Sequence, residues 1–172
     1  MADSDQMPDI APFRQSDRGT ALDAALAGGG LRWAGVPLLA YKEDAATPFR
    51  AVTRQILFHS SELLCEWRYF EVAPGGFSTL ERHEHAHGVM ILAGRGRALV
   101  GDLVRPVGPF DLVSIPSWTW HQFRAANDAP LGFLCLVNAV RDKPRLPSAD
   151  DLAALRRNPE IAAFLDGRAG KE

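Results

Sequence analysis

Between about residue 50 and residue 140, short apolar runs alternate with residues that form turns. The runs are rich in β-branched and aromatic residues: AVTRQILF, CEWRYFEV, GVMILAG, RALVGD, DLVSIP, WHQFRA and LGFLCLVNAV. Turn signals recur about every 8 to 12 residues without a helical stretch between them, which is typical of an antiparallel sandwich or barrel. Two of the expected turns lie at 73–76 (APGG) and at Gly101–Asp102. The pattern therefore predicts an all-β domain.

The two ends of the chain have a different pattern. Residues 17–27 (DRGTALDAALA) read as a short helix that ends at the three glycines 28–30. At the other end, Ser148 is a plausible N-cap for the helix ADDLAALRRNPEIAAFLDG, Asp150 and Asp151 suit its positive end, and Pro159 should break or kink it. We therefore expect an N-terminal arm with a short helix (1–45), a β-barrel (46–141) and a C-terminal linker and helix (142–172).

Composition narrows the class of protein. A formal charge of -2 and a pI near 6.2 argue against a nucleic-acid binder, which usually has a basic face. No apolar run approaches the roughly 20 residues that span a bilayer, and the first residues are too acidic and polar for a secretory signal. Cys65 and Cys135 lie in apolar runs and are expected to be buried free thiols. We expect a cytoplasmic protein without a nucleic-acid or membrane partner.

Chemistry is concentrated in the stretch ERHEHAH. Glu81, His83, His85 and His87 occupy every second position, so in an extended strand their side chains would point to one face. Imidazoles with a carboxylate suit a zinc, iron, manganese, nickel or copper ion. A polar, solvated edge strand would also contain histidines, but three of them within five residues, in phase with a carboxylate, favour a metal site. His59 stands alone beside two serines and is expected in a surface loop.

The stretch from Gly75 to Asn127 resembles the two sequence motifs of the cupin family. The first motif runs Gly, His-x-His, a Glu a few residues on and a closing Gly, and the second runs Gly, Pro-x-Gly, then His and Asn. The matching segments here are PGG at 74–76, the histidine run, VMILAG at 89–94, FDLVSIP at 110–116 and SWTWHQFR at 117–124. The resemblance implies a jelly-roll barrel, that is, an antiparallel double-stranded β-helix, with His121 beside the histidines of the first motif.

Departures from the motifs leave two ligand sets open. Counting back from Gly94 places His87 where the motif glutamate usually stands, with Glu81 and His83 as the first pair; this register is favoured. The other register takes His83 and His85 as the His-x-His pair. Both registers share three metal ligands: His83, His87 and His121.

In the second motif, aromatic residues stand at two positions where glycine is usual. Phe110 takes the place of the first glycine, and Trp118 replaces the glycine between Pro116 and His121. Trp118 is then either a wall at the barrel mouth or ordinary packing at its rim.

Cupin-like barrels include dioxygenases, lyases, isomerases, decarboxylases and non-catalytic binders, so the resemblance does not by itself assign an activity. We expect one divalent metal ion (Fe, Mn, Ni, Cu or Zn), with Fe or Mn favoured because the donors mix histidine and carboxylate. The leading hypothesis is a metal-dependent, dioxygenase-like oxygenase acting on a small organic substrate that coordinates the metal.

Two alternatives to the oxygenase stay open. If Glu81 is not a ligand it can act as a general base, which favours a lyase or isomerase. A small-molecule-binding module without turnover is the other alternative. We also expect a homodimer that pairs through sheet edges, with the N-terminal arm covering an exposed edge.

Overall fold

The computed structural model describes residues 30–42 and 48–168 of the 172-residue chain. Nine strands in this part form one antiparallel sheet. They are β1 (Leu39–Ala40), β2 (Arg50–Ser60), β3 (Cys65–Phe77), β4 (His87–Gly94), β5 (Gly96–Val100), β6 (Leu103–Val107), β7 (Leu112–Ile115), β8 (His121–Ala125) and β9 (Leu131–Asn138). The all-β prediction is confirmed. The helix expected at 17–27 lies outside the described residues.

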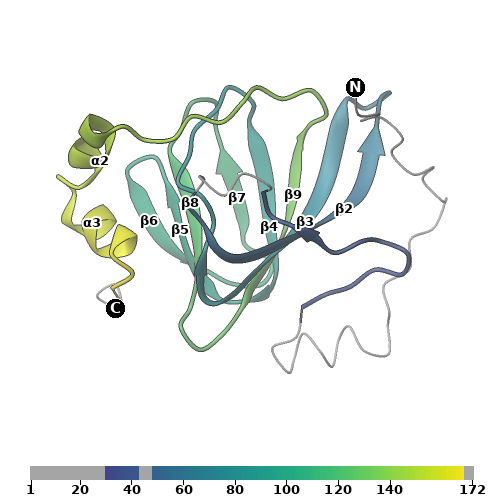
Figure 1. The fold of residues 1–172 in the computed structure, drawn as a ribbon, viewed down its shortest axis with the longest axis horizontal. Coiled ribbons are helices and arrows are strands. Elements are labelled where there is room, and N and C mark those ends of the chain that lie inside the picture. The colour runs from purple at the N-terminus through teal and green to yellow at the C-terminus, as the bar shows by residue number, and fades with distance from the viewer. Residues whose placement is uncertain (1–29, 43–47, 169–172) are drawn as a thin grey trace.

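The sheet curls around an apolar interior (Figure 1). Its main path runs β6-β5-β8-β3-β9-β4-β7, and β2 and then β1 continue from β3. β3 takes part in both halves of the curl because it pairs with β9 along its first part and with β8 at its last residue, while β2 lies along its other edge. The strands therefore enclose a core. The first residues of β4 and β8, His87 and His121, lie close together at one end of that core.

Alternation along each strand decides which side chains enter the barrel. On β3, Glu66, Phe70 and Val72 share one side and are buried, whereas on the other side Trp67 is 41% exposed and Tyr69 is buried. The Phe70 ring is tilted against that of Phe133, and Phe133 stacks on Phe123, at centroid distances of 5.5 and 4.6 Å. The barrel core consists of Val52, Phe70, Val72, Val89, Ile91, Ala98, Val107, Ile115, Phe123, Ala125, Leu131, Phe133, Cys135 and Val137.

Two short helices cover the outer face of β5 and β6 (Figure 1). Ser148 caps α2 (Ala149–Leu155) in a reciprocal capping box with Asp151, and Pro159 is the first residue of α3 (Pro159–Leu165). The predicted cap and the predicted break at Pro159 are both confirmed. Because α3 buries Ile161 and Phe164 against Leu99, this side of the sheet has a second core.

One expected turn is confirmed and the other is wrong. Gly101, with a φ of 65°, forms the tight connection between β5 and β6. Residues 73–76, in contrast, continue β3 without a break. Gly75 adopts a φ of 69°, and the register opposite shifts between Arg50 and Val52. The glycines therefore serve a bulge that bends the strand rather than a turn that ends it.

Phe110 and Trp118, the two aromatic residues at motif glycine positions, both have left-handed backbones. Their φ values are 73° and 57°. The Phe110 N–H donates to the Ile91 carbonyl (2.8 Å) and the Trp118 N–H to the His83 carbonyl (2.7 Å), so hydrogen bonds hold both conformations. The backbone therefore keeps the glycine-type shape although the side chains have changed.

Replacing Phe110 with glycine is expected to stabilise the protein by about 1 kcal/mol, because a left-handed backbone is strained for any residue with a Cβ. Phe110 is 81% exposed, so little packing is lost with the ring. Urea unfolding measures the change. Leu112→Gly is the matched control, because Leu112 is also exposed and has no positive φ, and it should destabilise. A Phe110→Gly variant that is less stable than the unchanged protein would contradict this reading.

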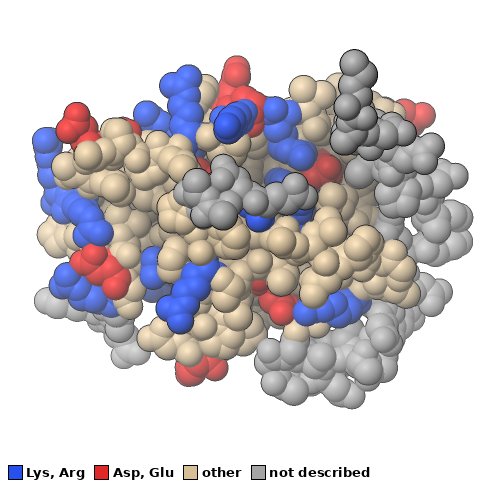
Figure 2. All heavy atoms as spheres, viewed as in Figure 1, with Lys and Arg blue, Asp and Glu red and all other residues tan. Residues whose placement is uncertain are grey.

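No helix in the described ranges is long and apolar enough to cross a membrane. On the face shown in Figure 2, basic and acidic side chains are interspersed rather than separated by sign. The division into arm, barrel and C-terminal segment stays a prediction.

Candidate metal centre

A cavity of about 230 Å³ opens inside the barrel, where the segment before β4 meets the start of β8. Its lining includes Phe70, Phe123 and Phe133 from the core. All five residues that the sequence predicted for the site also line it: Glu81, His83, His85, His87 and His121. Residues far apart in the sequence therefore share one space.

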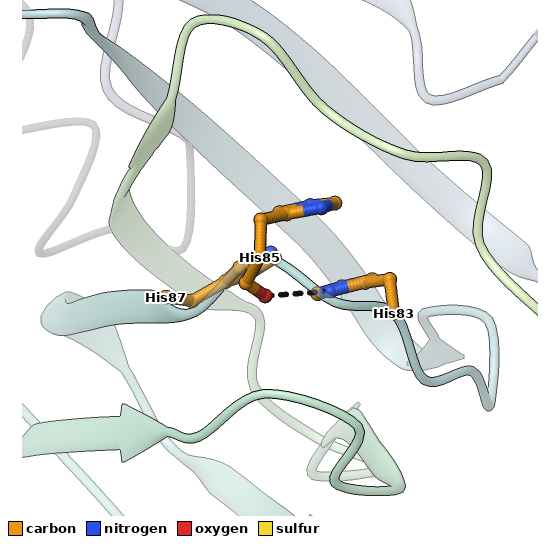
Figure 3. A group of neighbouring side chains, drawn as sticks. All are labelled: His83, His85 and His87. Carbon is orange, nitrogen blue, oxygen red and sulfur yellow. Dashed lines mark hydrogen bonds between the residues drawn. The ribbon is translucent and has the colours of Figure 1, made fainter.

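Backbone pairing places these side chains. Glu81 and His121 exchange two hydrogen bonds, 3.2 Å from Glu81 N–H to the His121 carbonyl and 3.0 Å in return. Residues that pair in this way point to the same side of a sheet. His87 then starts β4, and the three neighbouring histidines follow one another along this segment (Figure 3).

Each histidine has its Nδ1 engaged outside the centre of the cluster. The Nδ1 of His83 lies 2.8 Å from the His85 carbonyl, and that of His121 lies 2.9 Å from the Thr119 carbonyl (Figure 3 shows the first). Since a carbonyl only accepts, both rings carry a proton on Nδ1 and present the lone pair of Nε2. The Nε2 atoms of His83 and His87 are buried and have no hydrogen-bond partner among the described residues.

The donor atoms lie close enough to share one ion. Two groups have all donors within 4.8 Å of one another: His83 with His85 and His87, and Glu81 with His83 and His121. The rings of His83 and His87 lie 4.5 Å apart and those of His83 and His121 lie 4.9 Å apart. His83 is common to both groups. Orphaned Nε2 atoms beside a carboxylate fit a divalent metal ion. Which four residues bind it stays a prediction.

Burial keeps these imidazoles neutral. It is the main reason why the pKa of His83 falls to about 4, and the nearby His121 and His85 rings lower it further. Burial also lowers the pKa values of His87 and His121, and for His87 the neighbouring His121 and His83 add to the effect. Neutral imidazole is the form that binds a metal, so at neutral pH His83, His87 and His121 need to lose no proton first.

The same shifts predict how the metal-free protein responds to acid. An unfolded histidine titrates near 6.5, so between that pH and about 4 the unfolded chain binds more protons than the folded one. The His83 shift alone should therefore lower the free energy of unfolding by about 2 kcal/mol as the pH drops from about 6.5 to about 4.5, and the lowered pKa values of His87 and His121 add to this fall. Urea unfolding in a chelator measures this fall. A His83→Gln variant should show a shallower decrease, and an equal slope would contradict the assignment.

Asp142 fixes the position of His85. Its carboxylate accepts from the His85 ring (2.6 Å) and from the backbone N–H groups of Glu84 and His85. Desolvation raises the pKa of Asp142, but these hydrogen bonds outweigh it and hold the pKa well below its usual range. The side chain of Glu84, which is out of phase with the histidines, is exposed. Sequence reasoning missed Asp142 because the linker that contains it has no chemical pattern of its own.

Lys42 is a second residue that the sequence did not indicate. It comes from the segment after β1, and its ammonium group forms an ion pair with the Glu81 carboxylate. Both side chains are largely buried, 23% and 9% exposed, and both line the cavity. The pair can hold and move a proton at the wall of the cavity.

Cys135 lines the cavity, although the sequence did not indicate it for the site. Cys135 is far from the histidines in sequence, yet its Sγ lies 3.5 Å from the His87 Nδ1, and burial raises the pKa of its thiol. Both cysteines are free, as predicted, but Cys65 is only half-buried.

His59 lies on β2 rather than in the predicted loop and does not line the cavity. Trp118 does not line it either; Arg145 stacks on its ring, which agrees with rim packing.

Comparisons with known proteins agree with this architecture. Residues 68–137 match the cupin domain model. The 1-methylthio-D-xylulose 5-phosphate methylsulfurylase of Rhodospirillum rubrum is 66% identical over 139 residues, which is 81% of this chain and 89% of that protein.

Solved structures give the same result. A cupin-2 domain protein from Rhodospirillum rubrum is 67% identical with a TM-score of 0.77, over 81% of this chain and 93% of that one. A cupin 2 conserved barrel protein from Rhodopseudomonas palustris is 58% identical with a TM-score of 0.73, over 77% and 92%. The cupin match lies on the strands that surround the histidine cluster, and the identity to these relatives extends over most of both chains. This protein therefore belongs to the cupin family.

Proposed function

We propose that this protein is a metal-dependent enzyme that removes the methylthio group from 1-methylthio-D-xylulose 5-phosphate. The observation that carries the proposal is its 66% identity to the Rhodospirillum rubrum protein of that name, over 81% of the chain. The buried histidine–carboxylate cluster supports it. The proposed substrate has a ketone beside the C–S bond, and a metal ion bound by such a cluster would polarise that ketone.

The chemistry of such a substrate defines what the site must do. Its sulfur is bonded to C1, beside the C2 ketone. When the thiolate of a small thiol attacks this sulfur, an S–S bond forms, the C1–S bond breaks and its electron pair passes to C1 as an enolate. C1 then takes one proton. The products are a mixed methyl disulfide and a 1-deoxy ketose phosphate, so the thiol is oxidised and the carbon is reduced.

The residues of the cavity match these requirements. A divalent ion held by the histidine cluster would act as a Lewis acid on the ketone oxygen and so favour cleavage. Glu81 and Lys42, joined as an ion pair in the cavity wall, are positioned to deliver the proton to C1. The aromatic side chains of Phe70, Phe123 and Phe133 keep the cavity partly apolar, which strengthens charge interactions inside it.

The attacking thiol is proposed to come from solution rather than from the protein. Cys135 lines the cavity, but burial raises the pKa of its thiol, so it stays protonated at neutral pH. A thiol that remains protonated is a weak nucleophile. A small thiol that enters with its thiolate already formed avoids this cost.

The test is a direct assay with the proposed substrate. Purified protein with its metal is incubated with 1-methylthio-D-xylulose 5-phosphate and a low-molecular-weight thiol, and NMR follows the loss of the S-methyl signal and the appearance of a C1 methyl group. Product formation that needs both protein and thiol supports the proposal. Unchanged substrate with fully metal-loaded protein would sink it.

Oxygenase activity is the second candidate, and one observation favours it. Three or four ligands of mixed histidine and carboxylate type leave open positions on a metal that takes five or six. We propose iron or manganese as that metal on the same ground. Elemental analysis by mass spectrometry identifies the metal. An oxygen electrode then separates the two activities, since only the oxygenase consumes dioxygen, and no turnover of either kind leaves a binding module.

We also propose that the protein forms homodimers through the edges of the sheet. β6 and β7 end the main strand path and are therefore free to pair with a second copy. Light scattering measures the mass in solution. A monomeric mass for the full chain would contradict this proposal.

A further inference from the structure

Three arginines gather in the lining of the cavity, and the guanidinium of Arg68 lies over the Phe70 ring, 5.2 Å from its centroid. Arg54 comes from β2, Arg68 from β3 and Arg141 from the segment after β9, and all three line the cavity. The strand register explains this, because Arg68 stands opposite Cys135, whose side chain points into the barrel. The protein as a whole has a net charge of -2, but this part of the cavity wall has an excess of positive charge.

A single buried carboxylate serves two of these arginines. The Oε1 atom of Glu66 lies 3.4 Å from the Arg68 Nε and 3.3 Å from an Arg141 Nη. The Glu66 side chain is 8% exposed. Neither contact is a hydrogen bond: Glu66 Oε1 and Arg68 Nε are both buried without a hydrogen-bond partner among the described residues. One carboxylate at this range cannot satisfy two guanidinium groups, each of which has five donors.

Burial and the neighbouring arginines both disfavour the charged form of Arg141, while Glu66 favours it. Burial lowers the pKa of its guanidinium, the neighbouring Arg68 lowers it further, and Arg54 acts in the same direction. Like charges held this close in a partly buried site raise the free energy of the folded protein unless an anion joins them. The arrangement is thus one that a bound dianion would stabilise.

We propose that Arg68 and Arg141, with Arg54, bind the phosphate group of a phosphorylated substrate. A planar guanidinium group can donate two parallel hydrogen bonds to two oxygens of one phosphate, and arginine is therefore common in phosphate-binding sites. The anion site itself rests on the arginine cluster, whereas its assignment to a ketose phosphate rests on the proposed function.

The position of the cluster suits a substrate that spans the cavity. An Arg68 Nη lies 3.8 Å from the Cys135 Sγ, and that sulfur lies 3.5 Å from the His87 Nδ1. One thiol therefore separates the arginines from the histidine cluster. A pentose phosphate bound by its phosphate at the arginines would direct its other end, with the ketone, toward the histidines and Glu81.

The experiment is isothermal titration calorimetry with inorganic phosphate at fixed ionic strength, on the full chain with its metal. Arg141→Met is expected to weaken phosphate binding by about tenfold or more, because it removes a charge-assisted contact. Glu66→Gln is expected to strengthen binding by about threefold or more, because it removes the competing carboxylate. Arg95→Met is the matched control: Arg95 pairs with Asp128 on the surface, does not line the cavity, and should not change binding.

Opposite shifts in Arg141→Met and Glu66→Gln support the inference, since a purely structural role would give losses in both. Unchanged affinity in Arg141→Met and Glu66→Gln would overturn it and assign phosphate to the metal or another surface. If Arg141→Met does not fold, as judged by circular dichroism, Glu66→Gln alone decides by the same criterion.

Turnover separates this inference from the proposed function. With 1-methylthio-D-xylulose 5-phosphate, Arg141→Met should raise KM by about tenfold and leave kcat within about threefold, because the contact holds substrate and transition state equally. Normal kinetics in Arg141→Met would overturn the phosphate site and leave the function intact. If the unchanged protein binds phosphate as expected but never turns over this substrate, the proposed function fails and the anion site stands.

Discussion

Replacing His83 with alanine is expected to weaken metal binding by at least about a hundredfold and to abolish turnover, because even residues outside the ligand set often cost tenfold to a hundredfold when lost. His83 belongs to both groups of donors that can share an ion, and its Nε2 is buried with no hydrogen-bond partner in the part of the chain that the structure describes. Loss of His83 therefore damages the site in whichever way the other ligands are divided. Elemental analysis of dialysed protein measures the metal, and the proposed assay measures turnover.

Two further variants make the His83 result specific. His83 is only 1% exposed, so alanine leaves a hole; His83→Gln fills most of that space and should lose the metal as well. His59→Ala removes a histidine that does not line the cavity and should keep its metal. Full metal content in folded His83→Gln would show that the ion is bound elsewhere in the protein.

Replacing Glu81 with glutamine is expected to lower kcat by about a hundredfold to ten-thousandfold while the metal stays bound, because the group that handles the proton is lost. Glutamine keeps the shape of the side chain but cannot form the ion pair with Lys42. Product formation by NMR gives kcat, and elemental analysis on the same sample gives the metal content.

Glu84→Gln is the matched control for Glu81. Glu84 lies three residues further along, its side chain is exposed, and the variant should keep its full kcat. If Glu81→Gln loses metal and activity together, Glu81 is a ligand, as the favoured sequence register holds. If both stay unchanged, the ion pair with Lys42 has no part in the reaction.

Local patterns predicted what depends on neighbours in the sequence. Glu81 and His83 were placed in the site by their alternation, and Ser148 and Pro159 by the chemistry of helix ends; the structure brings the first two to one cavity and confirms the cap and the break. The expected turn at 73–76 failed because glycine permits a bulge as readily as a turn, and only strand pairing decides between them.

Residues brought to the cavity by distant pairing could not be predicted. Lys42 comes from the arm, Asp142 from the linker, and Cys135 from a strand whose apolar run predicts burial alone. No local pattern connects any of them with the histidines, because the contact exists only once the sheet has curled. The cytoplasmic location and the N-terminal helix expected at 17–27 stay predictions.

The second core, under α3, has a consequence for how this chain can diverge from its relatives. The cupin match ends at residue 137, whereas Ile161 and Phe164 lie beyond it and cover Leu99 and Val104 on the outer face of the barrel. An apolar outer face would be exposed to water without the helices, and the apolar residues of α3 would be exposed without that face. Substitutions at these two places should therefore occur together during evolution. Cupins that lack the two helices are expected to have polar residues at the positions of Leu99 and Val104.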